Sequence, residues 1–376
     1  MRRFISFLMF SLFFSCSNCR SFDGELYITE ASEQVYTIKK GDILYAYPKS
    51  DVVFVKTNGN TYNYVLSEDK TEQMIGNQKV KFIKQKAFLV ITYDDCPASD
   101  WNAYQNIHKQ YEPVIPAELG LNYLRRALPL EQMREMIADG FEVVNHGTSH
   151  HRLERVGLQK AVSKGENKIY GWFVHTFLDG AEITIDDKVY SVLSHGSDST
   201  GNYFQVEPEL QKNYYVGTSI QLSENELMKE LFYGINDIEK ELQIKINHFT
   251  YPYTVSDKRT RNMIKESNKY YSCRAYNGYY SDGKTKNLYD PGLNYFPFEN
   301  NLTLNSASYD LYYTEEEIKM IFDKIAKTKS MAIQFNHTWD NNFSNNKMKF
   351  IIDTANEMGI EISTRTPIWE YYEIND

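Results

Sequence analysis

The sequence predicts an α/β fold: a barrel of short parallel strands and helices that follows a small β module and contains a β-rich insertion. After residue 86, apolar runs typical of strands buried on both faces alternate with segments whose apolar residues recur at helical spacing. Several of these runs end directly in acidic or histidine residues, as strands do at the carboxyl face of a barrel. We expect the β module at residues 20–86, the barrel domain at residues 87–376 and the insertion at about residues 152–222.

The composition allows a large core and argues against some partners. The chain has 376 residues, of which 42% are hydrophobic, enough for more than one structural unit. Its formal net charge is -9 and no basic block is visible, so nucleic acid is not expected as a partner. Thirty tyrosines and 21 phenylalanines would suit stacking on carbohydrate, although biased coding would produce the same abundance.

Residues 1–19 resemble a signal peptide followed by a lipoprotein tether. Arg2 and Arg3 precede an apolar stretch, residues 4–14, that is too short to span a bilayer. Ser15 and Cys16 then form a pattern similar to a bacterial lipoprotein cleavage site, with Phe13 where leucine is usual. We therefore expect an exported protein that lipid on Cys16 anchors to a membrane of the cell envelope, with secretion as the alternative.

Residues 20–86 are predicted to form short strands. Runs rich in tyrosine, valine, isoleucine and phenylalanine alternate with turn residues such as Gly41, Pro48 and Gly59. No residue pattern in this module indicates chemistry. We expect a structural role, with weak glycan binding as the alternative.

Two adjacent acids end the first strand of the barrel domain. The apolar residues 87–91 lead into Asp94 and Asp95. Two carboxylates together at the end of a buried strand cost Coulomb and desolvation energy, which a cation or a bound proton relieves. For an isolated pair, a helix cap or an Asx-turn would be the simpler interpretation.

A pair of histidines ends the next predicted strand. A helix opened by Pro129 and ended by Gly140 precedes the strand, residues 141–145, which leads into His146-Gly147-Thr148-Ser149-His150. Histidines four apart lie on one face of a helical turn, a spacing with which two imidazoles can reach one metal ion. Such a pair is usually a surface feature, but its place at a strand end favours metal binding.

The insertion reads as a set of hairpins. Runs at residues 168–178, 181–194, 203–206 and 214–222 are typical of strands, with a turn at Asp186-Asp187. The insertion grows from the loop after the histidines, so it would overhang the catalytic face and shape a substrate groove. His175 and His195 fall within it, and we expect them to be ordinary hairpin residues.

Alternation of helices and strands resumes at residue 223. Ser223 and Glu226, and later Thr314 and Glu317, have the spacing of capping boxes that open helices. Further strands are expected at residues 244–249, 271–274, 331–335 and 360–363, and further helices near 263–264, at 345–358 and near 368–372. The strand 244–249 leads into Thr250-Tyr251-Pro252-Tyr253, and the strand 331–335 leads into Asn336-His337.

These strand-end residues would converge on one face of a parallel barrel. One carboxylate and two imidazoles make a three-ligand site suited to Zn²⁺ or a similar divalent ion. The ion would also explain the costly acid pair, because one acid would bind it while the other stayed free as a base. A histidine at a late strand end, His337, would complete an acid–base pair.

At this point four motifs resemble the polysaccharide deacetylase family (carbohydrate esterase family 4, NodB-like). Its T-F-D-D-G motif is similar to residues 92–96, and its H-[ST]-x-x-H motif to residues 146–150. The Pro-Tyr of its third motif matches Pro252-Tyr253, and its late Leu-x-His motif is similar to residues 335–337. The resemblance covers about residues 88–363, without the insertion.

The resemblance implies an irregular (β/α) barrel and an enzyme that hydrolyses carbon–nitrogen bonds other than peptide bonds. It implies that Asp94 is the general base and His337 the general acid. The implied metal ligands are Asp95, His146 and His150, and the implied ion is zinc, with cobalt, nickel, manganese or iron as alternatives. The backbone N–H of Tyr253, after Pro252, would help to hold the oxyanion. The substrate would be an acetylated polysaccharide at the cell envelope, and the products acetate and a free amino group on the sugar.

Three positions depart from the family pattern, and the altered third motif, together with the β insertion and the aromatic richness, supports a second hypothesis. Cys96 and Gly147 replace a glycine and a hydroxyl residue, and the arginine that steadies the base is absent from the third motif, where Thr250 stands. Arg274 or Arg365 could replace it in space. The alternative is an exported glycan-binding lipoprotein on a barrel whose catalysis has decayed. The presence of all five implied catalytic and metal-binding residues favours the enzyme. The sequence leaves open which glycan is used and whether the acyl group is on nitrogen or oxygen.

Overall fold

The computed structural model divides the chain into two compact units, Met1–Gln85 and Lys86–Asp376. It describes residues 21–28, 35–39, 43–46, 52–57, 60–65, 70–75, 78–278, 285–296, 298 and 300–372. The predicted signal peptide and lipoprotein site, with Cys16, lie outside these residues. Within the described residues, no helix combines the length and the apolar character that crossing a membrane would need.

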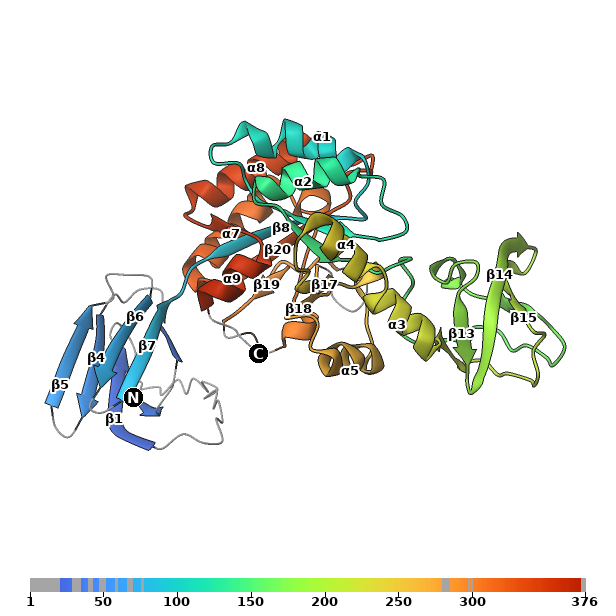
Figure 1. Ribbon diagram of the computed structural model, residues 1–376, viewed down its shortest axis with the longest axis horizontal. Coiled ribbons are helices and arrows are strands. Elements are labelled where there is room, and N and C mark those ends of the chain that lie inside the picture. The colour runs from blue at the N-terminus through green and yellow to red at the C-terminus, as the bar shows by residue number, and fades with distance from the viewer. Residues whose placement is uncertain are drawn as a thin grey trace, which may run out of the picture. The chain divides into compact units, whose positions relative to one another are not determined.

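The first unit contains two sheets (Figure 1). One has the order β2 (Val35–Lys39), β1 (Ser21–Ile28), β4 (Val52–Thr57), β5 (Asn60–Val65), and all its pairs are antiparallel. The other has the order β3 (Ile43–Ala46), β7 (Gln78–Lys84), β6 (Lys70–Ile75). β6 is not among the runs that the sequence pattern predicts as strands, because its residues KTEQMI lack the aromatic and β-branched character of the others.

The second unit is built on a ring of parallel strands, which confirms the predicted α/β barrel. Each strand pairs in parallel with the next along the chain. The strands in this series are β8 (Phe88–Asp94), β9 (Glu118–Leu121), β10 (Glu142–Asn145), β17 (His248–Thr250) and β18 (Ser272–Arg274). The sequence pattern did not predict β9, whose residues are ELGL.

The ring is closed by a segment too irregular to count as a strand. Leu304 forms a parallel bridge with Arg274, and Ala307 forms one with Gln334 of β20 (Met331–Asn336). β20 then pairs in parallel with β8 over six residue pairs. Because every connection in the ring is parallel, the carboxyl ends of all these strands open on one face. The one bridging segment and the short strands make the barrel irregular.

Two short strands flank the ring. β19 (Leu293–Asn294) pairs antiparallel with the first residues of β20, and β21 (Glu361–Ile362) pairs in parallel with the first residues of β8. All seven residues of β8 are buried, as expected for a strand covered on both faces.

Helices are arranged around the strands (Figure 1). They are α1 (Ser99–Asn106), α2 (Leu130–Ala138), α3 (Glu224–Phe232), α4 (Ile235–Leu242), α5 (Lys258–Ser267), α6 (Tyr309–Tyr312), α7 (Glu315–Thr328), α8 (Asn345–Glu357) and α9 (Arg365–Tyr372). The Ser223 hydroxyl accepts a hydrogen bond from the Glu226 N–H, and Thr314 with Glu317 forms a complete capping box. Gly234, with φ +75°, separates α3 from α4.

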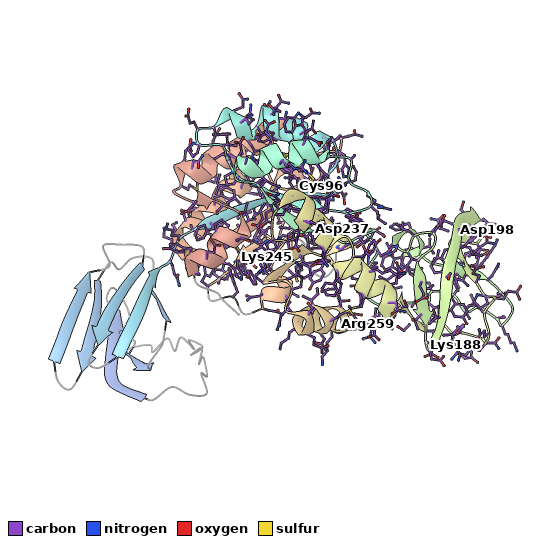
Figure 2. The ribbon with its side chains drawn as sticks, viewed as in Figure 1. Cys96, Lys188, Asp198, Asp237, Lys245 and Arg259 are labelled. Carbon is purple, nitrogen blue, oxygen red and sulfur yellow. The ribbon has the colours of Figure 1, made fainter. Side chains whose placement is uncertain are left out.

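The predicted insertion forms a six-stranded antiparallel sheet. The order is β11 (Val156–Gly157), β16 (Ser219–Leu222), β13 (Glu182–Ile185), β14 (Lys188–Asp198), β15 (Gly201–Glu207), β12 (Lys168–Tyr170). Figure 2 labels Lys188 and Asp198, the two ends of β14. Two of the predicted strands are shorter than expected. The run at 168–178 leaves the sheet after Tyr170 and then includes the 3₁₀ helix η2 (Val174–Thr176). The run at 214–222 joins the sheet only at Ser219.

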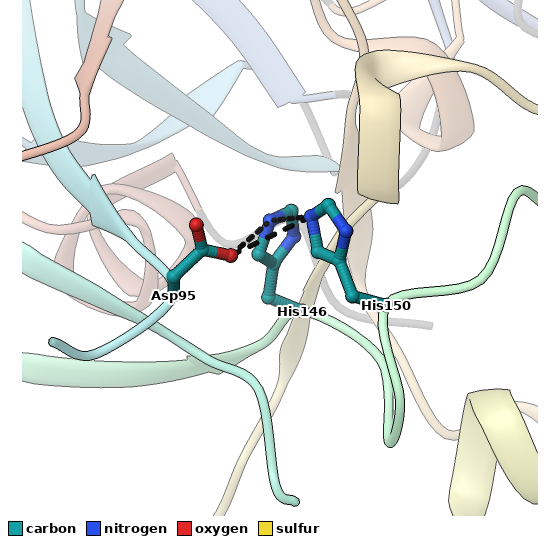
Figure 3. A group of neighbouring side chains, drawn as sticks. All are labelled: Asp95, His146 and His150. Atoms are coloured by element: carbon teal, nitrogen blue, oxygen red, sulfur yellow. Dashed lines mark hydrogen bonds and ion pairs between the residues drawn. The ribbon is translucent and has the colours of Figure 1, made fainter. Parts of the chain in front are cut away.

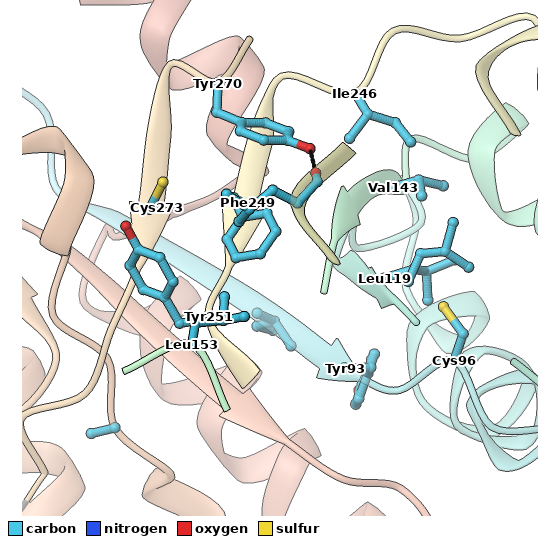
Figure 4. Close-up of a cluster of buried hydrophobic side chains, with 14 of the residues drawn as sticks. Tyr93, Cys96, Leu119, Val143, Leu153, Ile246, Phe249, Tyr251, Tyr270 and Cys273 are labelled. Carbon is cyan, nitrogen blue, oxygen red and sulfur yellow. Dashed lines mark hydrogen bonds between the residues drawn. The ribbon is translucent and has the colours of Figure 1, made fainter. Parts of the chain in front are cut away.

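The core of the barrel unit is largely aromatic and aliphatic (Figure 4). Phe249, Tyr251 and Tyr270 pack their rings together, with centroids 5.3 and 5.4 Å from that of Phe249. Cys96 and Cys273 are both buried in this core as free thiols. Burying side chains of this size contributes roughly 1.5–3 kcal/mol each, so the core holds the strand ends, and hence the site, in place.

Candidate metal centre

The chain makes a left-handed turn directly after Asp94, the last residue of β8. Asp95 has φ +76° and Cys96 φ +48°. The carbonyl of Cys96 accepts hydrogen bonds from the N–H groups of Ala127 and Leu128, both at 3.0 Å, which hold the turn. Cys96 therefore keeps the left-handed conformation for which the resembled family uses glycine, at a cost of roughly 1–2 kcal/mol.

The two histidines lie on a loop after β10, not on a helical turn as the sequence suggested. Gly147 has φ +84° and His150 φ +66°, so the backbone leaves the helical region at both positions. The two imidazoles nevertheless meet, because Nε2 of His150 lies 3.2 Å from Nε2 of His146. The prediction that both rings meet at one point is borne out by this loop rather than by helical spacing.

Asp95, His146 and His150 offer three ligand atoms within 4.8 Å of one another (Figure 3). The Asp95 Oδ1 atom lies 3.6 Å from Nε2 of His146 and 3.5 Å from Nε2 of His150. Two nitrogens bound at 2.0–2.1 Å to one tetrahedral ion would lie roughly 3.3 Å apart, so the spacing suits such an ion. The carboxylate and imidazole donors are those that Zn²⁺ and similar divalent ions take.

Other contacts prepare the histidines as ligands. Nδ1 of His146 lies 3.0 Å from the carbonyl oxygen of Thr250, the last residue of β17, and this orients Nε2 toward the centre. Burial and the neighbouring His146 lower the pKa of His150, which keeps that imidazole neutral and able to donate a lone pair. His150 thus has the protonation state that a metal ligand needs.

Glu230 of α3 holds the histidine loop. Its carboxylate accepts hydrogen bonds from the N–H groups of Ser149, at 2.9 and 3.1 Å, and of His151, at 2.9 Å. Burial raises the pKa of Glu230 to about 7, against the lowering effect of these bonds. A Cβ on Gly147 would stand 2.5 Å from Oε1 of Glu230, so a serine or threonine at this position would displace the carboxylate. Gly147 and Glu230 therefore belong to one arrangement.

Arg274 supplies the cation beside Asp94. Its Nη2 donates to Oδ2 of Asp94 at 2.6 Å, and both side chains are almost wholly buried. Burial would raise the pKa of Asp94, but Arg274, together with His146 and His337, lowers it below the ordinary value, so the group is a carboxylate at neutral pH. In the parallel register, Arg274 of β18 pairs with Thr250 of β17, the position where the family arginine is missing.

The other candidate arginine, Arg365, forms an ion pair with a different acid. Nε of Arg365 donates to Oε1 of Glu118 at 2.8 Å, and Glu118 is the first residue of β9. Asp94, by contrast, is the last residue of β8. Of the two candidate arginines, it is Arg274 that reaches the acid pair.

His337 follows β20 and lies at the edge of the centre. Its Nε2 is 3.9 Å from Oδ2 of Asp95, and its side chain is 26% exposed, so it can meet a substrate from the solvent side. Trp339 donates its indole N–H to the same Asp95 oxygen at 3.2 Å. The Thr338 hydroxyl donates to the buried Asp100 in the first turn of α1 at 2.6 Å, which fixes the segment that carries both rings.

Pro252 and Tyr253 face the histidines from the turn after β17. Tyr253 has φ +55°, and its ring centroid lies 4.7 Å from that of His150. A Cβ on Gly147 would lie 3.1 Å from the Pro252 ring, so this turn packs directly on the histidine loop. The backbone of Tyr253 is thereby placed beside the ligand cluster, as the resemblance implied.

The two insertion histidines are not ligands of the cluster. His195 contacts Asp179 at 2.6 Å and the Val174 carbonyl at 2.9 Å, whereas His175 packs its ring edge-on to Tyr253 at 6.2 Å. Sequence reasoning missed Glu230 and Trp339. The position of Trp339, two residues after His337, was a usable signal, but nothing local marked Glu230.

No family model and no curated protein matches the chain. Among solved structures, the chain is similar to a family 4 carbohydrate esterase domain of a multidomain xylanase from the hindgut metagenome of Trinervitermes trinervoides. The sequence identity is 11% and the TM-score is 0.41, and the match covers 77% of this chain and 93% of that one. It is also similar to a family 4 acetyl xylan esterase from Clostridium thermocellum in complex with cobalt, with 13% identity, 75% and 90% coverage, and a TM-score of 0.39.

A third similar structure is a family 4 pseudoenzyme from Bacillus anthracis, with 10% identity, 75% and 65% coverage, and a TM-score of 0.40. All three descriptions name the family that the sequence motifs resemble.

Proposed function

We propose that this protein is a metal-dependent polysaccharide deacetylase that removes acetyl groups from an N-acetylated or O-acetylated polysaccharide at the cell envelope. One observation carries the proposal: a cluster of Asp95, His146 and His150 lies beside a buried carboxylate, Asp94, that is paired with Arg274. Oδ2 of Asp94 lies 4.0 Å from Nε2 of His146, so an acid that is not needed as a ligand stands next to the cluster.

A divalent ion held by Asp95, His146 and His150 would lower the pKa of a water molecule and polarise the acetyl carbonyl. Asp94, kept ionised by Arg274, accepts the proton of the attacking water. The backbone N–H of Tyr253 stabilises the oxyanion that forms on the acetyl carbonyl oxygen when the water attacks the carbon. His337 donates a proton to the leaving nitrogen or oxygen, so that water and the acetylated sugar give acetate and a free amino or hydroxyl group.

Two departures from the family pattern have a substitute in this fold. Arg274 stands beside Asp94 in place of the missing third-motif arginine, and Glu230 holds the histidine loop in place of a hydroxyl residue at position 147. Decay would leave such positions without substitutes. We therefore favour the enzyme over the glycan-binding protein.

We further propose that the protein is exported and anchored to a membrane of the cell envelope through lipid on Cys16. The support is the sequence pattern of residues 1–19. Mass spectrometry of the mature N-terminus tests it: a lipid-modified Cys16 is expected, and an unmodified terminus beyond Cys16 would refute the anchor.

The deacetylase is tested by metal analysis together with acetate release from N-acetylated and O-acetylated glycans. The wild type should bind one divalent ion and release acetate. Asp94→Asn should keep the ion and lose about 10²–10⁴-fold in rate, and His146→Ala should lose the ion. Asp353→Asn, on the exposed side of α8, is the matched control. Bound metal without acetate from any glycan would favour the glycan-binding protein instead.

A further inference from the structure

A line of rings leads from the metal ligands onto the insertion. The ring centroid of Tyr253 lies 4.7 Å from that of His150 on one side and 6.2 Å from that of His175 on the other. His175 belongs to η2 of the insertion and is exposed. Three residues before it stands Trp172, which is 54% exposed. We call Tyr253, His175 and Trp172 the aromatic wall.

Trp172 is held in position although it is exposed. The guanidinium carbon of Arg152 lies over its ring, 4.8 Å from the centroid, and covers one face. The backbone N–H of Trp172 donates to Oε1 of Gln159 at 3.2 Å. The indole is therefore orientated from one face, while about half of its surface remains open to solvent.

Arg152 is fixed as well, and it ties the wall to the histidine loop. Its side chain is only 11% exposed, and its Nη2 pairs with Oε1 of Glu154 at 2.5 Å. Its backbone N–H donates to the carbonyl of Thr176 in η2 at 3.1 Å. Arg152 follows His150 by two residues, which span at most about 7 Å of chain. One end of the wall, Tyr253, therefore contacts His150. The other end, Trp172, contacts Arg152, which belongs to the chain segment directly after His150.

We propose that the aromatic wall binds the sugars next to the acetylated sugar, so that the substrate is a glycan chain of several units and the insertion selects for chain length. This inference rests on the proposed function. Trp172 and His175 are the exposed members of the wall. Exposed aromatic rings with a polar edge suit sugars, which have an apolar C–H face bordered by hydroxyls. The aromatic wall is continuous with the metal centre, because Tyr253 packs on His150. A glycan chain with one sugar in the centre must continue along a neighbouring surface, so the occupant of the wall is a glycan chain.

The wall is tested by replacing Trp172 and measuring selectivity for length. For Trp172→Ala, the ratio of kcat/KM for a hexamer of β-1,4-linked N-acetylglucosamine to that for the dimer should fall roughly tenfold or more. Trp172→Phe, which keeps a ring, should recover part of the ratio. Tyr215→Ala is the matched control, because Tyr215 is a 74% exposed aromatic residue of the same insertion outside the wall. An unchanged ratio in Trp172→Ala would overturn the inference while leaving the deacetylase standing.

A binding measurement separates the two proposals. Asp94→Asn protein, with and without Trp172→Ala, is run in native gels that contain glycol chitin or acetylated xylan. Retardation by either polymer that Trp172→Ala abolishes and Tyr215→Ala retains would support the wall, even if the wild type released no acetate. Equal mobility of the two proteins in both polymers would refute it, whatever the activity.

Discussion

The ion pair between Arg274 and Asp94 permits a prediction of both stability and pH dependence. The two side chains are 0% and 2% exposed, and their closest atoms are 2.6 Å apart. Arg274→Met keeps most of the buried volume but leaves the Asp94 carboxylate without its cation. Removing one partner of a buried pair costs about 3–5 kcal/mol, which corresponds to a fall in Tm of roughly 10 °C for a unit of this size.

The same substitution should move the acidic limb of the pH–rate profile. In the wild type, burial raises the pKa of Asp94 and Arg274 outweighs it, so the pKa is lowered. Without Arg274 the effect of burial remains, and the limb of kcat/KM that reports the base should shift to higher pH. At neutral pH, kcat/KM should also fall by about 10²-fold, because the base is no longer held in position.

Two further variants sharpen this test. Arg134→Met removes an exposed arginine and should change stability by less than about 0.5 kcal/mol. The exchange Arg274→Thr with Thr250→Arg moves the guanidinium to the paired position on β17 and should restore part of the activity. Wild-type Tm and a wild-type acidic limb in Arg274→Met would refute the reasoning.

Three other substitutions test separate parts of the molecule. Glu230→Gln places an amide NH₂ against N–H groups that now donate hydrogen bonds to the carboxylate. Metal affinity should therefore fall about 10–100-fold in a chelator competition. The exposed control Glu224→Gln should bind metal as the wild type does. Trp339→Phe loses the hydrogen bond to Asp95 and should lower kcat/KM about 10–100-fold with unchanged Tm; equal activity would show that the bond is dispensable. Burial raises the pKa of Asp310 to about 6, so its stabilising contribution is complete below its unfolded pKa of about 4 and is lost as the pH rises through 6. Asp310→Asn should therefore flatten the decline in unfolding free energy between pH 4 and pH 8 by about 3 kcal/mol, and the exposed Asp323→Asn should leave the decline in place.

The local pattern of the chain was sufficient to predict the strand ends and several helix starts. The residues after β8, β10, β17 and β20 could be named because a buried strand has a short apolar run, and the polar residue that follows is visible in the sequence. The capping box at Thr314 and Glu317 was likewise predictable, because all its groups lie within four residues. The motifs then indicated which of these residues should meet.

Local patterns failed where the backbone conformation depends on distant contacts. The helical turn expected for the histidine pair is a loop, because Glu230, some 80 residues later, binds its N–H groups and fills the space over Gly147. The strand expected at residues 168–178 ends at Tyr170, where the chain turns so that Trp172 meets Arg152 and His175 meets Tyr253.

The acid pair at the end of β8 shows the division most clearly. The motifs predict unequal roles for Asp94 and Asp95, whereas the partner of each acid is set by the packing of the barrel. Arg274 reaches Asp94 only because β18 pairs with β17 in a register that sets Arg274 beside Thr250, and Trp339 reaches Asp95 only because β20 lies next to β8. Strand register and ring closure are set by contacts among residues far apart in the chain, and no periodicity within a single strand encodes them.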